Sequence, residues 1–196
     1  FMDHPVLQAI HTRRSVRKYQ QEQISDQLLD AVLEAGRYAP SGGNNQTTHF
    51  IVIQNHEVLR YLRDLVEREF ANMPLTDDLY SSLKSSIRQS QAGGYEFYYQ
   101  APTLIVVANK RAYGNAMADS ACALQNMMIA AHALGLGACW INQLHWLTDH
   151  PAIAEALGEI GLLPDETVCG GLSLGYSAQP DLQPLKRHGN PVTYVR

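Results

Sequence analysis

The sequence predicts an α+β fold, in which one sheet is flanked by helices, within a single domain over residues 1–196. Short apolar runs rich in β-branched residues, such as residues 104–107, indicate buried strands. Longer segments carry apolar residues at helical spacing. Helices and strands alternate without the regular rhythm of βαβ units, which argues against a doubly wound parallel sheet.

Each element follows from its local pattern. A short helix is expected over residues 3–11. Ser25 can cap a second helix, which should stop near Tyr38 because Ala39 precedes Pro40. We expect the later elements to be a strand over 50–53, helices over 56–70 and 76–91, a strand over 104–107, a long helix over 115–134 ended by Gly135 and Gly137, a strand over 139–141, a helix over 151–157 and a strand over 167–176.

Composition excludes several classes of protein. The formal net charge is −4, whereas a general nucleic-acid binder normally carries an excess of basic residues. The three cysteines and eight histidines are scattered, without Cys-x-x-Cys or His-Glu-x-x-His, which argues against a disulfide framework and a metal site. We expect no signal peptide, because polar residues such as His4, Gln8 and His11 interrupt any apolar run near the start of the sequence. The most apolar stretch, residues 116–136, contains polar groups that a membrane span would not carry, so we expect a cytoplasmic protein with no membrane partner.

The first candidate binding site is a cluster of basic residues. Four of the 15 lysine and arginine residues lie within residues 13–18, in an otherwise acidic chain. Arginine forks match phosphate oxygens, and a serine hydroxyl adds a neutral donor. In an extended segment, Arg13, Ser15 and Arg17 would share one face and converge on one anion. The alternative is a solvated basic surface.

Two further segments are rich in small residues. The loop over residues 40–46 would let backbone approach a flat ligand, and the amides of Asn44 and Gln46 could pair with a heterocycle; a plain turn is the alternative. Residues 134–142 place two glycines between a helix and a strand, and the backbone amides that follow could face a redox centre. The alternative is that the glycines only form a helix C-cap. No histidine or acidic residue lies at a spacing from Cys139 that would indicate an activated thiol, so Cys139 is not expected to be a nucleophile. No Rossmann fingerprint, P-loop or Gly-x-Ser-x-Gly elbow is present.

Together these motifs resemble the nitroreductase-like flavoprotein family. The order is Arg-Arg-Ser-x-Arg at residues 13–17, Pro-Ser-x-x-Asn-x-Gln at 40–46, a helix with Asp119 and Gln125-Asn126 that leads through Gly135 and Gly137 to Trp140, then Gly175-Tyr176 and a basic pair near the C-terminus. The resemblance covers nearly the whole chain. It implies a mostly antiparallel central sheet and a homodimer with one FMN at each subunit interface.

The resemblance also assigns roles to residues. The phosphate and ribityl chain would be held by Arg13, Arg14, Ser15 and Arg17, and by Lys186 and Arg187. The partner subunit would supply Pro40, Ser41, Gly42 and Asn44 to the ring, and Gln46 of the same loop is a further cofactor-binding candidate. Backbone at Cys139, Trp140 and Ile141 would lie beside the ring. The flavin carries the chemistry, so no catalytic side chain is named.

The implied activity is a ping-pong transfer of a hydride from NADH or NADPH, through FMN, to a small nitroaromatic, quinone or similar acceptor. A flavin-dependent dehalogenase or flavin-cleaving relative, and a non-catalytic FMN-binding or redox-sensing protein, stay open as alternatives. The chain departs from the family at Thr47-Thr48 and Ser177, where proline is frequent. Residues 70–100 match no motif, and their aromatic cluster at 95–99 either lines the substrate side of the flavin or packs in the core or dimer interface.

Overall fold

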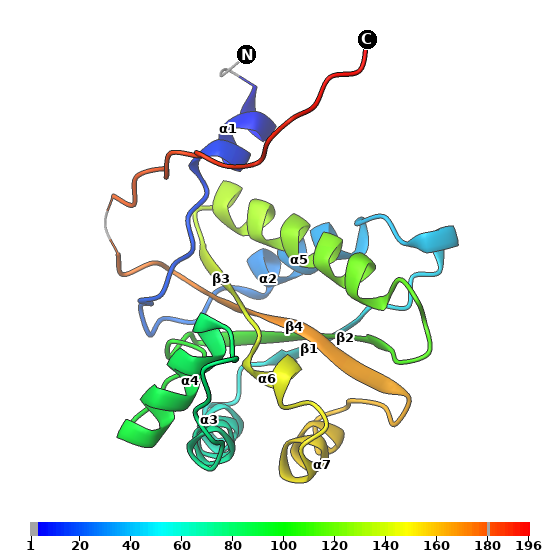
Figure 1. Ribbon diagram of the computed structural model, residues 1–196. Coiled ribbons are helices and arrows are strands. Elements are labelled where there is room, and N and C mark those ends of the chain that lie inside the picture. The colour runs from blue at the N-terminus through cyan, green and yellow to red at the C-terminus, as the bar shows by residue number, and fades with distance from the viewer. Residues whose placement is uncertain (1–3, 180) are drawn as a thin grey trace.

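The computed structural model describes residues 4–179 and 181–196, in which four strands form a sheet between two layers of helices (Figure 1). The strands are β1 (His49–Ile53), β2 (Thr103–Lys110), β3 (Gly137–Ile141) and β4 (Glu166–Gly175). Their order across the sheet is β1-β2-β4-β3, and every pairing is antiparallel. The predicted α+β fold with a mostly antiparallel sheet is therefore confirmed.

The helices divide between the two faces of the sheet. One face is covered by α2 (Asp26–Arg37) and α5 (Ala116–Ala133). The other face is covered by α3 (His56–Ala71), α4 (Ser81–Ala92), α6 (Gln143–Trp146) and α7 (Pro151–Glu159). The first helix, α1 (Pro5–Thr12), extends away from the sheet, and the C-terminal segment passes beside it (Figure 1).

Capping groups set the helix boundaries that the sequence predicted. The Ser25 hydroxyl accepts a hydrogen bond from the Leu28 N–H at 3.3 Å, which starts α2. At the end of α5, Gly135 has a φ of 77°, a conformation that glycine adopts without steric cost. Gly137 does not end α5, because it already belongs to β3.

Two other expectations need correction, and one short helix was not expected. The helix expected over residues 76–91 begins at Ser81, since the preceding residues form a turn whose Asp77 carbonyl accepts a hydrogen bond from Lys84 Nζ at 2.7 Å. Strand β2 continues to Lys110, because it stays paired with β4 beyond the apolar run. Helix α6 was not expected, since four residues are too few to show periodicity. Asp3, in the first expected helix, lies outside the described residues.

The core has two parts, one on each face of the sheet. Alternate residues of β2 contribute to the two parts of the core. Leu104 and Val106 pack toward α3 and α7, whereas Ile105 and Val107 pack toward α2 and α5. This two-sided burial explains why the sequence of β2 is continuously apolar rather than alternating. Among the described residues, no helix combines the length and the apolar character that crossing a membrane requires.

Candidate functional site

The basic segment over residues 13–17 lies along the free edge of β3, at one side of the sheet (Figure 1). The Val16 N–H donates to the Ala138 carbonyl at 3.0 Å, and Ser15 forms a parallel bridge with Ala138. Val16 is buried against β3, where a Cβ added to Gly137 would come within 2.8 Å of the Val16 side chain. Because extended backbone sends alternate side chains to opposite sides, Ser15 and Arg17 are directed away from the face that Val16 occupies.

Cys139 lies where these side chains meet. Burial raises the pKa of its thiol, while Arg17, the Ser15 side chain and Arg13 act in the opposite direction. Arg13, Ser15 and Arg17, the residues expected to share one face, thus all act on the electrostatics of the same thiol. A buried thiol with a raised pKa is protonated at neutral pH, which agrees with the expectation that Cys139 is not a nucleophile.

The arginines of this cluster are not neutralised. Arg13 Nη1 is buried and has no hydrogen-bond partner. Burial lowers the pKa of the Arg13 guanidinium, and the charges of Arg187 and Arg14 lower it further. Ion pairs formed among the described residues involve none of these three arginines. Since arginine stays protonated, the cluster is a partly exposed positive charge with one buried nitrogen, Arg13 Nη1, that lacks a partner. A bound anion such as a phosphate would satisfy it.

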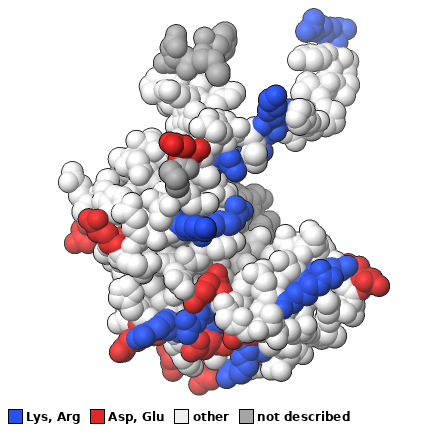
Figure 2. Space-filling view, turned by 90° about the vertical axis from the view of Figure 1, so that its left-hand side faces the viewer, with Lys and Arg blue, Asp and Glu red and all other residues white. Residues whose placement is uncertain are grey.

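The C-terminal segment completes this cluster. The Arg14 guanidinium donates to the Gln183 carbonyl, and the Gln179 side chain accepts a hydrogen bond from the Arg17 N–H at 2.7 Å. Arg187, which follows in this exposed segment, is near enough for its charge to lower the pKa of Arg13, although the two residues lie at opposite ends of the sequence. Lys186 is exposed in the same segment. Figure 2, which faces this side of the molecule, shows lysine and arginine side chains from the body up to the C-terminal segment.

Tyr99 sits against the cluster from the other side. The Arg17 guanidinium carbon lies 5.9 Å from the centroid of the Tyr99 ring, within the range of a cation–π contact. Tyr99 and Gln100 have φ values of 59° and 53°, a strained conformation for residues with side chains. The aromatic cluster at residues 95–99 is therefore divided: Tyr95, Phe97 and Tyr98 are buried in the core, and Tyr99 faces Arg17.

The loop over residues 40–46 contains a short 3-10 turn, η1 (Gly42–Asn44). Three of its residues have positive φ: Gly43 at 59°, Asn44 at 55° and Gln46 at 54°. The Ser41 hydroxyl accepts a hydrogen bond from the Gln46 N–H at 3.1 Å and closes the loop on itself. This is a defined and partly strained shape rather than a plain turn.

Asp119 anchors that loop to α5. Its carboxylate oxygens accept hydrogen bonds from the Gly42 N–H at 3.3 and 3.2 Å and from the Tyr113 hydroxyl at 2.7 Å. Sequence reasoning placed Asp119 in the family motif but gave it no role. The missed signal is that Asp119 is the only charged residue in the sequence of α5, and it is buried.

A hollow of about 390 Å³ lies beneath the loop, between α2 and the first turns of α5. Apolar and polar side chains both line it, among them Leu33, Phe50, Gln46, His49 and Asp119. His49 Nδ1 lies 2.9 Å from the buried carboxylate of Glu166, which fixes the ring. The hollow gives the loop one open side, where a flat group could be received.

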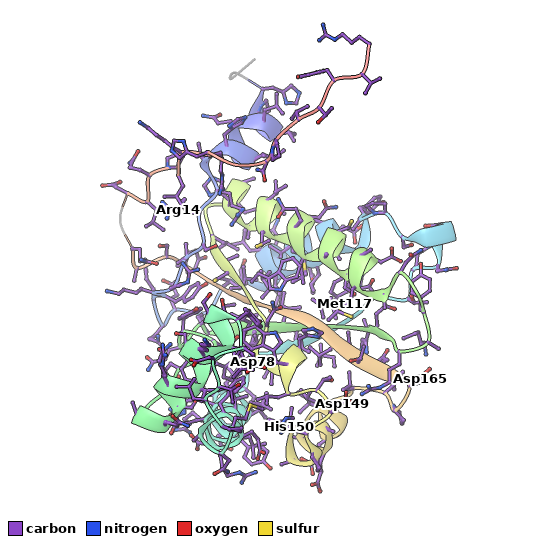
Figure 3. The ribbon with its side chains drawn as sticks, viewed as in Figure 1. Arg14, Asp78, Met117, Asp149, His150 and Asp165 are labelled. Atoms are coloured by element: carbon purple, nitrogen blue, oxygen red, sulfur yellow. The ribbon has the colours of Figure 1, made fainter. Side chains whose placement is uncertain are left out.

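The loop and the arginine cluster belong to opposite ends of α5. The loop is bound to Asp119 in the first turn, whereas Thr12, beside Arg13, is bonded to His132 in the last turn at 2.8 Å. At 1.5 Å per residue these two positions are roughly 20 Å apart. Figure 3 shows the same separation, with Met117 at one end of α5 and Arg14 beyond the other. One chain therefore does not bring both halves of the candidate site together.

The remaining predicted residues lie on β3. Trp140 is half-buried, and its indole N–H donates to Asn142 Oδ1 at 2.7 Å. Ile141 is buried in the core. Because β3 is an edge strand, one side of its backbone is paired with β4 and the other side faces the arginine cluster.

The chain is similar to known proteins in sequence and in structure. Residues 10–176 match the model of the nitroreductase family. A protein of Archaeoglobus fulgidus, named for NADH dehydrogenase and NAD(P)H nitroreductase activities, is 30% identical over 87% of this chain and 84% of its own length. A 4-nitrobenzoate reductase of a Nocardioides species is 27% identical over 95% of this chain and 88% of its own length.

Solved structures resemble the fold closely. A Bacteroides fragilis nitroreductase with bound FMN superposes with a TM-score of 0.87 at 38% identity, covering 98% of this chain and all of that one (100%).

Proposed function

Because the chain belongs to the nitroreductase family, we propose that it reduces flat nitroaromatic or quinone-like acceptors in a ping-pong reaction at one FMN site. The protein is an FMN-dependent oxidoreductase that uses NAD(P)H. The location of the FMN site is proposed from one observation. Arg13 Nη1 is buried without a hydrogen-bond partner, and other arginines lie around it.

The cluster fits the phosphate of FMN in charge and in donor type. Arg13, Arg14 and Arg17 offer guanidinium forks, and Ser15 adds a hydroxyl. Arg187 closes on the phosphate from the C-terminal segment, where its charge already reaches Arg13, and exposed Lys186 would join it. An anion here would neutralise repulsion between the arginines and give Arg13 Nη1 its missing partner.

The second half of the site would come from a partner subunit in a homodimer. The exposed face of α5 carries no charged residue, and all but one of its surface residues are small or apolar. They are Met117, Ala118, Cys122 and Ala133, with the polar Gln125. Pairing of two α5 helices about a two-fold axis would place the first turn of one beside the last turn of the other. Each arginine cluster would then face the partner's loop, with its Pro40, Ser41, Gly42, Asn44 and Gln46.

Bound FMN supplies the hydride chemistry, and the protein supplies binding and orientation. Backbone groups at Cys139, Trp140 and Ile141 would line the ring from the free side of β3. The Cys139 thiol, protonated and buried, offers neither a nucleophile nor a thiolate charge beside the ring. We place the reaction in the cytoplasm, a proposal supported by three cysteines that form no disulfide and by the use of NAD(P)H.

The kinetic scheme follows from a single open site. Without a second nucleotide-binding motif in the sequence, NAD(P)H and the acceptor should occupy that site in turn. Initial rates with varied NADH at several fixed concentrations of a quinone should give parallel double-reciprocal lines. Intersecting lines would contradict the scheme, and failure of both NADH and NADPH to reduce the bound flavin would contradict the catalytic role.

Arg17→Ala should lower the affinity for FMN by roughly 10- to 100-fold, since one charge-assisted contact is lost. Lys18→Ala, which removes an exposed neighbouring charge, is the matched control and should bind FMN normally. Quenching of FMN fluorescence by the apo-protein measures both affinities. If Arg17→Ala binds FMN with the affinity of wild type, residues 13–18 are a solvated basic surface.

A further inference from the structure

We propose that Asp119 is a positioning residue that acts across the dimer, by holding its own chain's loop in the shape that the partner's FMN requires. The proposal rests on the proposed two-subunit site, and its test separates the two ideas. Four observations carry it: the contacts of the Asp119 carboxylate, the close approach of Gly42, the strained loop backbone, and the distance between the loop and the arginine cluster.

Hydrogen bonds hold the loop to the Asp119 carboxylate. The Asp119 side chain reaches from the first turn of α5 to the Gly42 N–H, and the Tyr113 hydroxyl donates to the same carboxylate at 2.7 Å. Asp119 is 8% exposed. Its charge is further stabilised by the helix N-terminus, where the peptide dipoles favour an anion.

Gly42 is the residue that allows the loop to come this close. A Cβ at position 42 would lie 2.5 Å from Asn115 Nδ2 and 2.5 Å from the Tyr113 hydroxyl. The φ of Gly42 is not positive, so its backbone alone does not demand glycine. The absence of a side chain at this position therefore serves the contact with Tyr113, Asn115 and Asp119.

The loop needs an external anchor because its backbone is strained. Asn44 and Gln46 both have positive φ values, which residues with a Cβ adopt at a cost. The contact between Ser41 and Gln46 closes the loop but does not attach it to the body. Asp119 does attach it, and its charge is otherwise unexplained, since a buried carboxylate is expensive in a helix with no other charged residue.

The anchor should serve the partner's flavin rather than the flavin of its own chain. Asp119 and the arginine cluster lie near opposite ends of α5, roughly 20 Å apart. A loop released from Asp119 would therefore leave the chain's own arginines in place and remove contacts only from the flavin bound by the other chain.

Two mixed dimers test this directly, each purified through different tags on its two chains and titrated with FMN by fluorescence quenching. The first pairs an Arg13→Ala chain with an Asp119→Ala chain. One of its sites keeps both intact halves, so it should bind one FMN per dimer with wild-type affinity. The second pairs a doubly substituted Arg13→Ala, Asp119→Ala chain with a wild-type chain. Each of its sites then has one damaged half, so FMN should bind at least roughly 10-fold more weakly at both.

The reverse pattern, with tight binding only in the second dimer, would show that Asp119 serves its own chain and would overturn the proposal. Normal FMN affinity in the Asp119→Ala homodimer would also overturn it, while leaving the two-subunit site intact. If the Arg13→Ala homodimer binds FMN normally, the proposed site itself fails. Tight binding in the first dimer also shows that the Asp119→Ala chain is folded.

Two further variants keep the test independent of folding. Gly42→Ala leaves Asp119 in place but puts a methyl group where the Tyr113 hydroxyl and the Asn115 amide now lie, so these side chains or the loop must shift. It should weaken FMN binding in the same trans pattern. Asp119→Asn retains an acceptor oxygen and should restore part of the affinity lost in Asp119→Ala. Asp78→Ala, an exposed aspartate before α4, is the matched control and should change nothing.

Discussion

Arg13→Ala is expected to lower the affinity of the apo-protein for FMN by on the order of 100-fold, the largest effect of any single arginine. Arg13 combines a buried, unpartnered nitrogen with the repulsion of Arg14 and Arg187, so it has the most to gain from a bound phosphate. Arg13→Lys keeps the charge but loses the forked guanidinium group, so its affinity for FMN should lie between those of wild type and Arg13→Ala. Fluorescence titration of the apo-protein gives all three affinities.

Thermal unfolding of the apo-proteins separates binding from folding in this series. Because the Arg13 guanidinium is half-buried and repelled by neighbouring arginines in the absence of an anion, the Arg13→Ala apo-protein should be at least as stable as wild type. FMN should raise the melting temperature of wild type and have little effect on the variant. Arg68→Ala, on the surface of α3, is the control. A marked loss of apo-protein stability in Arg13→Ala would indicate a structural role instead.

Cys122→Arg is expected to convert the dimer into monomers and, with the same change, to abolish tight FMN binding. Cys122 is exposed near the middle of the uncharged face of α5. An unpaired arginine buried between two α5 helices would cost several kcal/mol. Sedimentation velocity reports the mass, and the flavin content of each species reports the site.

Cys122→Ser is the matched control for this substitution, because it keeps the size of the side chain without adding charge. It should remain a dimer that binds FMN. If Cys122→Arg is still a dimer with FMN, this face of α5 is not the interface. If it is a monomer that binds FMN as wild type does, the loop of the partner is not needed.

Much of the fold was predictable from local patterns. The β-branched run of β2, the Ser25 cap of α2 and Gly135 after α5 each act through their own neighbours, so each is visible in the sequence. The boundaries that were wrong depend on distant contacts. β2 extends to Lys110 because β4 continues beside it, and a short segment such as α6 is set by packing rather than periodicity.

The candidate site divides in the same way. The shared face of Arg13, Ser15 and Arg17 follows from extended geometry, and the structure places their segment along β3 beside Ala138 and Cys139. The approach of Arg187 to Arg13 joins the two ends of the chain, so the resemblance to the family could suggest it but spacing could not. The contact of Tyr99 with Arg17 and the anchoring of Gly42 by Asp119 had no local signature beyond an isolated charge in an apolar helix.

The most direct test of the two-subunit flavin site is sedimentation velocity of the purified protein, followed at both the protein and the flavin absorbance. The account predicts that FMN sediments only with a dimer, at one FMN per chain, and that the dissociated monomer carries none. A monomer that retains FMN would contradict it, and so would a dimer that neither contains nor takes up FMN.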